Sequence, residues 1–292
     1  MPDAKQPPAT RSLIGIGVVT AIALGMAFAG SQGSARVAGY PVFAIATALA
    51  FGIQLLAFIP AYMAQTERYY DLVGSITYLS VTGFALWVNP QPGALLLTAM
   101  VGVWALRLGS FLFTRILQDG SDQRFDRIKP YFLRFLLTWL LQGLWVTVTA
   151  GAAIAAMSSS RAVPLGVFAV VGLALWLIGF GIEAVADRQK RVFRKDPANK
   201  GRFITSGLWA WSRHPNYFGE ILLWFGVSVV AFPALSGWQL LTLVSPLFVY
   251  LLLTRVSGVP ALESQGKRRW GDDPEYRAYV ASTPALVLRP PR

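Results

Sequence analysis

The sequence predicts an all-α protein, a polytopic transmembrane helical bundle with seven to eight spans. Hydrophobic residues make up 54% of its 292 residues and charged residues only 14%, whereas soluble chains carry roughly 25% charged residues. Apolar stretches as long as a membrane helix recur along the chain, and the basic residues collect in alternate loops between them. Both features are typical of multi-pass membrane proteins.

Eight stretches satisfy the requirement of about 20 mostly apolar residues for a membrane helix. They are residues 12–30, 40–62, 71–88, 94–114, 131–157, 162–186, 217–234 and 238–256. Short turns rich in proline and glycine, at 89–93 and 233–237, separate two pairs of them. We expect residues 1–292 to form a single integral membrane domain in which 12–30 is an extra N-terminal helix.

The distribution of Lys and Arg predicts the orientation of the spans. With the N-terminus in the cytoplasm, 23 basic residues fall in inside segments, only Arg36 and Arg161 fall outside, and Arg107 lies within a span. This bias follows the positive-inside rule and predicts that the C-terminus is cytoplasmic. The first helix could instead be a cleaved signal peptide, which would leave seven spans and the same inside loops.

Composition also excludes several kinds of chemistry. The chain has no cysteine and a single histidine, His214, which excludes disulfides, iron–sulfur clusters and zinc–thiolate sites, so we expect no metal. The net charge of +12 is explained by membrane topology, and we expect no nucleic-acid partner. The partners that remain are the lipid bilayer and a small hydrophobic substrate.

Charged residues in and next to the spans mark a candidate site, because such residues are costly in a membrane and usually face a cavity or a partner. Arg107 and Arg115 are eight residues apart, so both can face one side of a helix. Near the end of the sixth span, Glu183, Asp187, Arg191 and Arg194 form one polar stripe, on a helix that we expect to continue beyond the membrane.

The run from Arg213 to Glu220 leads directly into the seventh span. It contains Arg213, His214, Asn216, Tyr217 and Glu220, and Glu263 follows the last span. Proline at 215 suits a helix start, and the free backbone N–H groups there suit an anion. Many arginines on the cytoplasmic side, with no P-loop or dinucleotide-binding glycine motif, favour a nucleotide cofactor held by inside loops.

These motifs resemble the steroid 5-alpha-reductase family, in particular its bacterial branch, and the resemblance covers about residues 40–290. It rests on Gly207-Leu208-Trp209 with the run 213–220, on the stripe 183–195, on residues 104–125 and on Ser257 to Tyr279. The cofactor motifs would therefore lie mainly in 104–125 and 181–279. The resemblance implies a multi-pass protein of the bacterial inner membrane.

The resemblance also implies an activity, the NADPH-dependent reduction of a carbon–carbon double bond conjugated to a ketone in a steroid or similar lipid. The resemblance matches Arg107, Arg115, Asp187, Arg191, Arg194, Asn216 and Glu220 to cofactor-holding residues of the family. Glu183 stands where the mammalian enzymes have asparagine, and Arg213 and His214 follow the bacterial and methyltransferase pattern instead. We expect these residues, together with Tyr217 and Glu263, to bind NADPH. No glutamate–tyrosine pair aligns with the mammalian catalytic pair. Asp71 and Tyr70 are the nearest chemical substitutes, because a carboxylic acid kept neutral by an apolar site can donate a hydrogen bond.

Two other classes of protein remain open. The element Arg213-His214-Pro215 is shared with isoprenylcysteine and phospholipid methyltransferases, so an S-adenosylmethionine-dependent lipid methyltransferase is the main alternative. S-adenosylmethionine has no phosphate, so it would not need Arg107, Arg115, Arg191 and Arg194 for binding. A transporter or structural membrane protein is the third, although the charges gather on one side and no broken-helix pair lies at the midplane.

Overall fold

The structure is a computed structural model that describes residues 9–291. Among these residues, eight helices are long and apolar enough to cross a membrane, as judged by length and composition. The protein is therefore an all-α, multi-pass membrane protein, and the predicted fold class is confirmed. The chain folds into two compact units. The expectation of one membrane domain stays a prediction.

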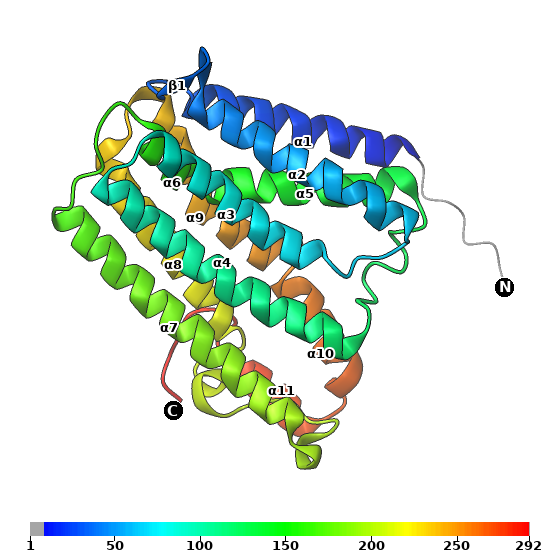
Figure 1. The fold of residues 1–292 in the computed structure, drawn as a ribbon. Helices are drawn as coiled ribbons and strands as arrows, with labels where there is room; N and C mark the ends of the chain where they lie inside the picture. Colours follow the sequence, from blue (N-terminus) through cyan, green and yellow to red (C-terminus); the bar gives the residue numbers. More distant parts are fainter. Residues whose placement is uncertain (1–8, 292) are drawn as a thin grey trace. The chain divides into compact units, whose positions relative to one another are not determined.

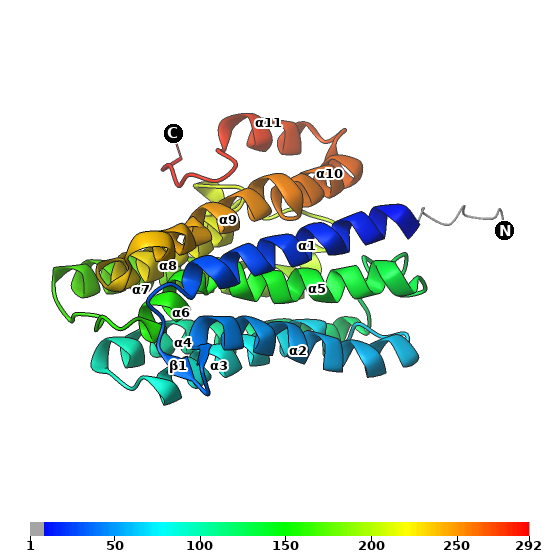
Figure 2. The same cartoon turned by 90° about the horizontal axis from the view of Figure 1, so that it is seen from above.

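The first unit comprises the described residues up to Phe168 and residues Val230–Val244. Its elements in chain order are α1 Ala9–Gly30, β1 Arg36–Val37, β2 Tyr40–Pro41, α2 Val42–Met63, α3 Tyr70–Val88, α4 Pro92–Asp119, α5 Phe132–Thr149, α6 Gly151–Ser158, and the 3-10 segments η3 Phe232–Ala234 and η4 Gly237–Val244. The two short strands pair antiparallel, with Arg36 opposite Pro41. Helix α5 packs against both α1 and α2, and α3 packs against α4 (Figures 1 and 2).

The predicted span 131–157 is not one helix, and this expectation was wrong. Helix α5 ends at Thr149 with Ala150 as its C-cap, and the short helix α6 begins at Gly151. Glycine is a poor helix former, so a break there costs little. Every residue of α6 is buried, and this helix contacts α2, α3, α4 and α5.

The second unit comprises Ala169–Val229 and Ser245–Arg292. It contains nearly all of α7 Val167–Lys195 and α8 Pro215–Ala231, then η1 Pro197–Asn199, η2 Gly207–Ala210, α9 Ser245–Leu251, the π-helical turn η5 Leu252–Val256, α10 Val259–Trp270 and α11 Pro274–Ser282 (Figure 1). Proline starts α8, α10 and α11 within their first two positions, where its missing N–H has no helical partner anyway.

Helices α7 and α8 approach each other closely through glycine. A Cβ atom added at Gly219 would lie 2.5 Å from the carbonyl oxygen of Gly179 and 2.7 Å from the backbone nitrogen of Glu183. One at Gly226 would lie 2.6 Å from the carbonyl oxygen of Gly172. Small residues are used in this way where membrane helices pack backbone to backbone. The contact sets the distance between the polar residues that both helices carry.

Candidate functional site

The predicted site residues fall in both units. Four lie in the first unit, on α3 and α4: Tyr70, Asp71, Arg107 and Arg115. The other ten lie in the second unit: Glu183, Asp187, Arg191, Arg194, Arg213, His214, Asn216, Tyr217, Glu220 and Glu263.

In the first unit, Asp71 and Arg115 are neighbours. A carboxylate oxygen of Asp71 lies 3.9 Å from a guanidinium nitrogen of Arg115, and both side chains are partly exposed. The hydroxyl of Tyr70 donates a hydrogen bond to the carbonyl oxygen of Thr138 at 2.9 Å. A residue assigned to the cofactor and one assigned to catalysis are thus adjacent, while the hydroxyl of Tyr70 joins α3 to α5.

Glu67 is a buried charged residue that the sequence pattern did not identify. Its carboxylate accepts a hydrogen bond from the backbone N–H of Asp122 at 2.8 Å and pairs with the ammonium group of Lys129 at 3.0 Å. Burial of Lys129 acts to lower its pKa, but the hydrogen bonds to Glu67 and Asp126 outweigh that effect and raise the pKa. The carboxylate of Glu67 therefore holds the loop between α4 and α5. No spacing motif in the sequence indicated this role of Glu67.

In the second unit, the polar stripe lies on α7 as expected, because this helix extends without a break to Lys195. Glu183 is buried, with 2% of its surface exposed. The amide of Asn216 on α8 donates a hydrogen bond to a carboxylate oxygen of Asp187 at 3.3 Å. Two residues assigned to the cofactor are thus already joined across the α7–α8 contact.

The segment before α8 is held by the C-terminal residues. Ser212 is fully buried, and its hydroxyl donates to the carbonyl oxygen of Leu286 at 2.9 Å and accepts from the backbone N–H of His214 at 3.1 Å. The backbone N–H of Arg213 donates to the carbonyl oxygen of Pro284 at 2.9 Å. The backbone N–H groups of Arg213 and His214 are therefore both held by hydrogen bonds, one to Pro284 and one to Ser212.

His214 is a buried ring without a hydrogen bond. Only 5% of its surface is exposed, it stacks on Tyr217 with the ring centroids 5.5 Å apart, and neither ring nitrogen has a hydrogen-bond partner among residues 9–291. The carboxylate of Glu263 is 3.8 Å from its Nε2. Burial, and then the charges of Lys190 and Arg213, lower the pKa of His214 to about 3, so the ring is neutral at pH 7.

A cavity of about 130 Å³, which we call the basic cavity, adjoins these residues. Five basic side chains and one acidic side chain line it: Lys190, Arg194, Arg202, Arg213, Arg269 and Glu263. The acidic group is already used, because Glu263 pairs with Arg213 at 2.8 Å. Of the predicted cofactor residues, the structure brings Arg194, Arg213, His214 and Glu263 to this cavity.

Aromatic rings form much of the remaining wall of the basic cavity. They are Phe193, Phe203, Trp209, Trp270, Tyr276 and Tyr279. The hydroxyl of Tyr279 donates to the carbonyl oxygen of Trp209 at 2.7 Å, and burial raises the pKa of Tyr279 to about 12. The indole N–H of Trp209 in turn donates to the carbonyl oxygen of Ala186 at 3.1 Å, so the C-terminal helix is connected to α7.

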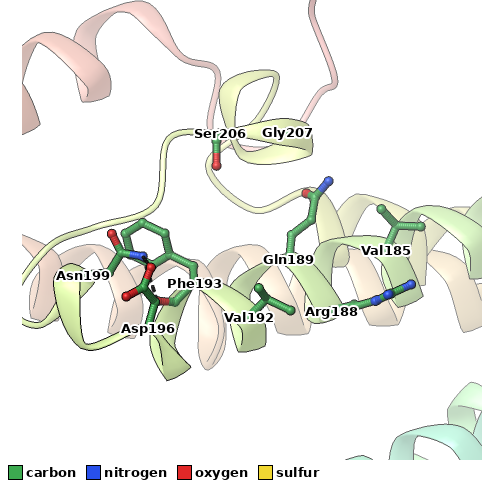
Figure 3. Close-up of a pocket in the computed structure, with 9 residues that line it drawn as sticks. All are labelled: Val185, Arg188, Gln189, Val192, Phe193, Asp196, Asn199, Ser206 and Gly207. Atoms are coloured by element: carbon green, nitrogen blue, oxygen red, sulfur yellow. Dashed lines mark hydrogen bonds between the residues drawn. The ribbon is translucent and has the colours of Figure 1, made fainter.

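A second and larger hollow, of about 520 Å³, lies along α7, and we call it the α7 groove (Figure 3). Gln189 extends from α7 toward Gly207, and its amide oxygen accepts from the backbone N–H of Leu208 at 3.0 Å. Asp196 and Asn199 lie together beside Phe193. Since Asp196 caps the turn η1 through the backbone N–H of Ala198, these polar groups serve the local fold.

Sequence reasoning missed several residues of the basic cavity. Lys190 and Arg202 lie in charged stretches in which neighbouring residues were selected instead. Arg269 lies in the run Lys267-Arg268-Arg269, which no motif set apart from other basic residues. The aromatic wall could not be assembled from the sequence, since its rings come from α7, the loop before η2, η2, α10 and α11. A basic residue next to an aromatic one, as in Arg202-Phe203 and Arg269-Trp270, was the available signal.

The apolar spanning helices define the class, a polytopic membrane protein, and its second unit contains a basic cavity lined by aromatic rings. The particular family follows from the comparison with family models. The chain belongs to DUF1295, a family of proteins of unknown function, whose model matches residues 19–283.

Comparisons with individual proteins give more distant similarity. The chain is 26% identical over 129 residues to the probable O-methyltransferase ustE of Ustilaginoidea virens, covering 42% of this chain and 43% of that one. It is 23% identical over 248 residues to an uncharacterized protein of Schizosaccharomyces pombe, covering 74% and 70%. It is 36% identical over 87 residues to 3-oxo-5-alpha-steroid 4-dehydrogenase 1 of Rattus norvegicus, covering 30% and 31%.

These matches are partial. The chain spans less than half the length of the methyltransferase and about a third of the rat dehydrogenase. No solved structure matches the chain. The expected resemblance to the steroid 5-alpha-reductase family is thus supported as a distant relationship, and its assignment to a bacterial branch stays a prediction.

Proposed function

We propose that this protein is a membrane-embedded NADPH-dependent reductase of a carbon–carbon double bond conjugated to a ketone, acting on a 3-oxo-4-ene steroid or a similarly flat lipid. The observation that carries the proposal is the basic cavity, in which five cations face a single carboxylate. The local similarity to the rat steroid dehydrogenase supports the same chemistry. The cofactor side would be cytoplasmic, in a bacterial inner membrane.

The residues of the basic cavity suit a phosphorylated dinucleotide. Arg194 and Arg213 offer guanidinium groups for phosphate oxygens, and such charge-assisted bonds are the strong ones. The buried nitrogens of His214 and the Nε of Arg213, unpaired among residues 9–291, are groups that a bound ligand would satisfy, since unpaired buried polar atoms are costly. The ring of His214 stays neutral, so one nitrogen donates and the other accepts.

The other residues assigned to the cofactor have supporting roles in this proposal. Asp187 and Asn216 would orient it through their shared hydrogen bond, with Glu183, Tyr217 and Glu220 beside them. Arg107, Arg115 and Arg191 would add positive charge for the phosphates. When bound, NADPH supplies a hydride.

Asp71 and Tyr70 are proposed to act at the ketone oxygen of the substrate. A donor in a dry pocket stabilises the negative charge that develops on this oxygen when a hydride reaches the β-carbon. Asp71 would have to carry a proton to donate in this way, and Arg115 at 3.9 Å would hold its side chain in place. Asp71→Asn, which keeps a donor, should therefore retain more activity than Asp71→Ala.

A methyltransferase that uses S-adenosylmethionine is the second candidate function. The observation in its favour is the similarity to the probable O-methyltransferase, which covers more of the chain than the similarity to the rat dehydrogenase. S-adenosylmethionine carries no phosphate, so its affinity would depend little on the cations of the basic cavity.

The test is a pair of titrations of the detergent-purified protein, one with NADPH and one with S-adenosylmethionine. Arg194→Ala should weaken NADPH binding roughly 10–100-fold, because a hydrogen bond to a charged group contributes about 1.5–3 kcal/mol. Arg188→Ala is the matched control, since this arginine lies on the same helix and lines the α7 groove instead. Tight binding of S-adenosylmethionine with no response to NADPH would overturn the proposal.

A further inference from the structure

A single hydrogen bond joins two segments that each carry an arginine of the basic cavity. The indole N–H of Trp270, the last residue of α10, donates to the carbonyl oxygen of Gly201 at 2.5 Å. Arg269 precedes Trp270, and Arg202 follows Gly201. Both arginines line the cavity, so this bond joins the two backbone segments from which they extend.

Of the five cations that line the cavity, these two have no partner among the described residues. Arg213 is paired with Glu263, Arg194 interacts with another described group of the chain, and the ammonium group of Lys190 lies 4.4 Å from the ring centroid of Trp209. The guanidinium groups of Arg202 and Arg269 make no ion pair or side-chain hydrogen bond with any described residue of the chain. Both arginines are exposed, so their guanidinium groups are accessible to a dianion, whose charge they would complement.

The two joined segments also carry aromatic rings that line the cavity. The ring of Phe203 lies 5.7 Å from that of Trp270 and 5.1 Å from that of Tyr276, measured between centroids. A planar base can stack on such rings, at about 1–3 kcal/mol for each base. Rings beside two guanidinium groups suit a nucleoside that carries a phosphate monoester.

The size of the cavity limits what it can hold. A pocket that encloses a whole drug-sized ligand measures roughly 300–1,000 Å³, whereas the basic cavity measures about 130 Å³. It is large enough for one end of a dinucleotide only. The end of NADPH that combines a base with a phosphate monoester is the adenosine 2′-phosphate, and this monoester is the group that NADH lacks.

We propose that Arg202 and Arg269 bind the 2′-phosphate of NADPH beside the rings of Phe203 and Trp270, and that this pair makes the protein select NADPH over NADH. The inference rests on the proposed reductase function and adds to it the residues that determine cofactor specificity.

The experiment measures the dissociation constants of NADPH and NADH for the full-length protein and for Arg202→Ala, Arg269→Ala and the double variant. Each single variant should lose about tenfold or more in NADPH affinity with NADH affinity unchanged, since each removes a charge-assisted contact to phosphate. Arg268→Ala is the control, because this neighbouring arginine bonds to Ser264 at 3.1 Å and does not line the cavity. It should leave both constants unchanged.

Two further results separate the possible failures. In competition with NADPH, adenosine 2′,5′-bisphosphate should bind more tightly than adenosine 5′-monophosphate or inorganic phosphate, and the double variant should abolish that advantage. If the unmodified protein binds NADPH but the double variant keeps its NADPH-to-NADH preference, the inference is wrong and the reductase proposal stands. If the unmodified protein binds neither dinucleotide, both are overturned.

Discussion

Replacing Gly219 by alanine tests whether the contact between α7 and α8 is as close as the structure shows. The new Cβ atom would lie 2.5 Å from the carbonyl oxygen of Gly179 and 2.7 Å from the backbone nitrogen of Glu183. Cβ atoms in real proteins essentially never lie within 3.0 Å of such atoms. Because both obstacles are backbone atoms, no side chain can rotate away, and the helices themselves must separate.

The size of the effect follows from this geometry. Overpacking of a well-packed contact costs about 1–3 kcal/mol, and the absence of any movable side chain places Gly219→Ala near the upper end. A loss of that size lowers the melting temperature by roughly 2–4 °C per kcal/mol for a chain of 150–250 residues. Separation of the helices would also lengthen the bond between Asp187 and Asn216, so NADPH affinity should fall as well.

The assay is thermal unfolding of the purified protein in detergent, with Gly181→Ala as the control. Gly181 is also on α7, but a Cβ atom there would meet nothing within 4 Å. Alanine at an open helical position should be neutral or stabilise by up to about 1 kcal/mol. If Gly219→Ala melts at or above the temperature of the unmodified protein, as Gly181→Ala should, the close contact is not present and the reasoning is refuted.

Three other substitutions test single features of the two units. Glu67→Ala should destabilise the protein by about 2–3 kcal/mol, because it removes a buried partner of Lys129. In the same denaturation assay, Asp126→Ala, at an exposed partner of Lys129, should cost under about 1 kcal/mol. Equal losses would contradict the role of Glu67 in holding the loop. His214→Gln should flatten the fall in melting temperature between pH 6.5 and pH 4. The unfolded chain takes up a proton on histidine near pH 6.5, which folded His214 resists until about pH 3, so stability is lost as the pH falls through this window, by about 1.4 kcal/mol per unit; an unchanged pH profile would show that another group titrates there. Ser212→Ala should weaken NADPH binding several-fold, because it releases the backbone N–H of His214, whereas an unaltered dissociation constant would show that this segment does not position the cofactor.

The class of fold could be predicted from the sequence because its signal is local. Length and hydropathy are properties of single stretches, and all eight predicted spans correspond to helices that are long and apolar enough to cross a membrane. The break at Ala150 was missed, since an apolar helix and an apolar break in a helix have the same hydropathy. The extension of α7 to Lys195 was found, because the polar stripe keeps its helical spacing beyond the apolar part.

The candidate site was only partly predictable. Spacing and motif identified Arg194, Arg213, His214 and Glu263, which the structure brings to one cavity. They did not identify Arg202 or Arg269, whose surroundings in the sequence are those of ordinary loop and lipid-facing arginines. Arg202 and Arg269 line the same cavity, and the segments that carry them are joined by the bond between Trp270 and Gly201. These two residues are about 70 positions apart in the sequence.

The amino-acid sequence is sufficient to show that this chain is a helical membrane protein with its positive charge gathered in alternate loops, because apolar length and charge bias are properties of single segments. Which of the many cations remain unpaired beside aromatic rings depends on the folded chain. Glu263 neutralises Arg213 and Glu67 neutralises Lys129 across long separations in sequence. Pairing between distant charges is a property of the folded chain. The unpaired guanidinium groups of Arg202 and Arg269 define the proposed 2′-phosphate site.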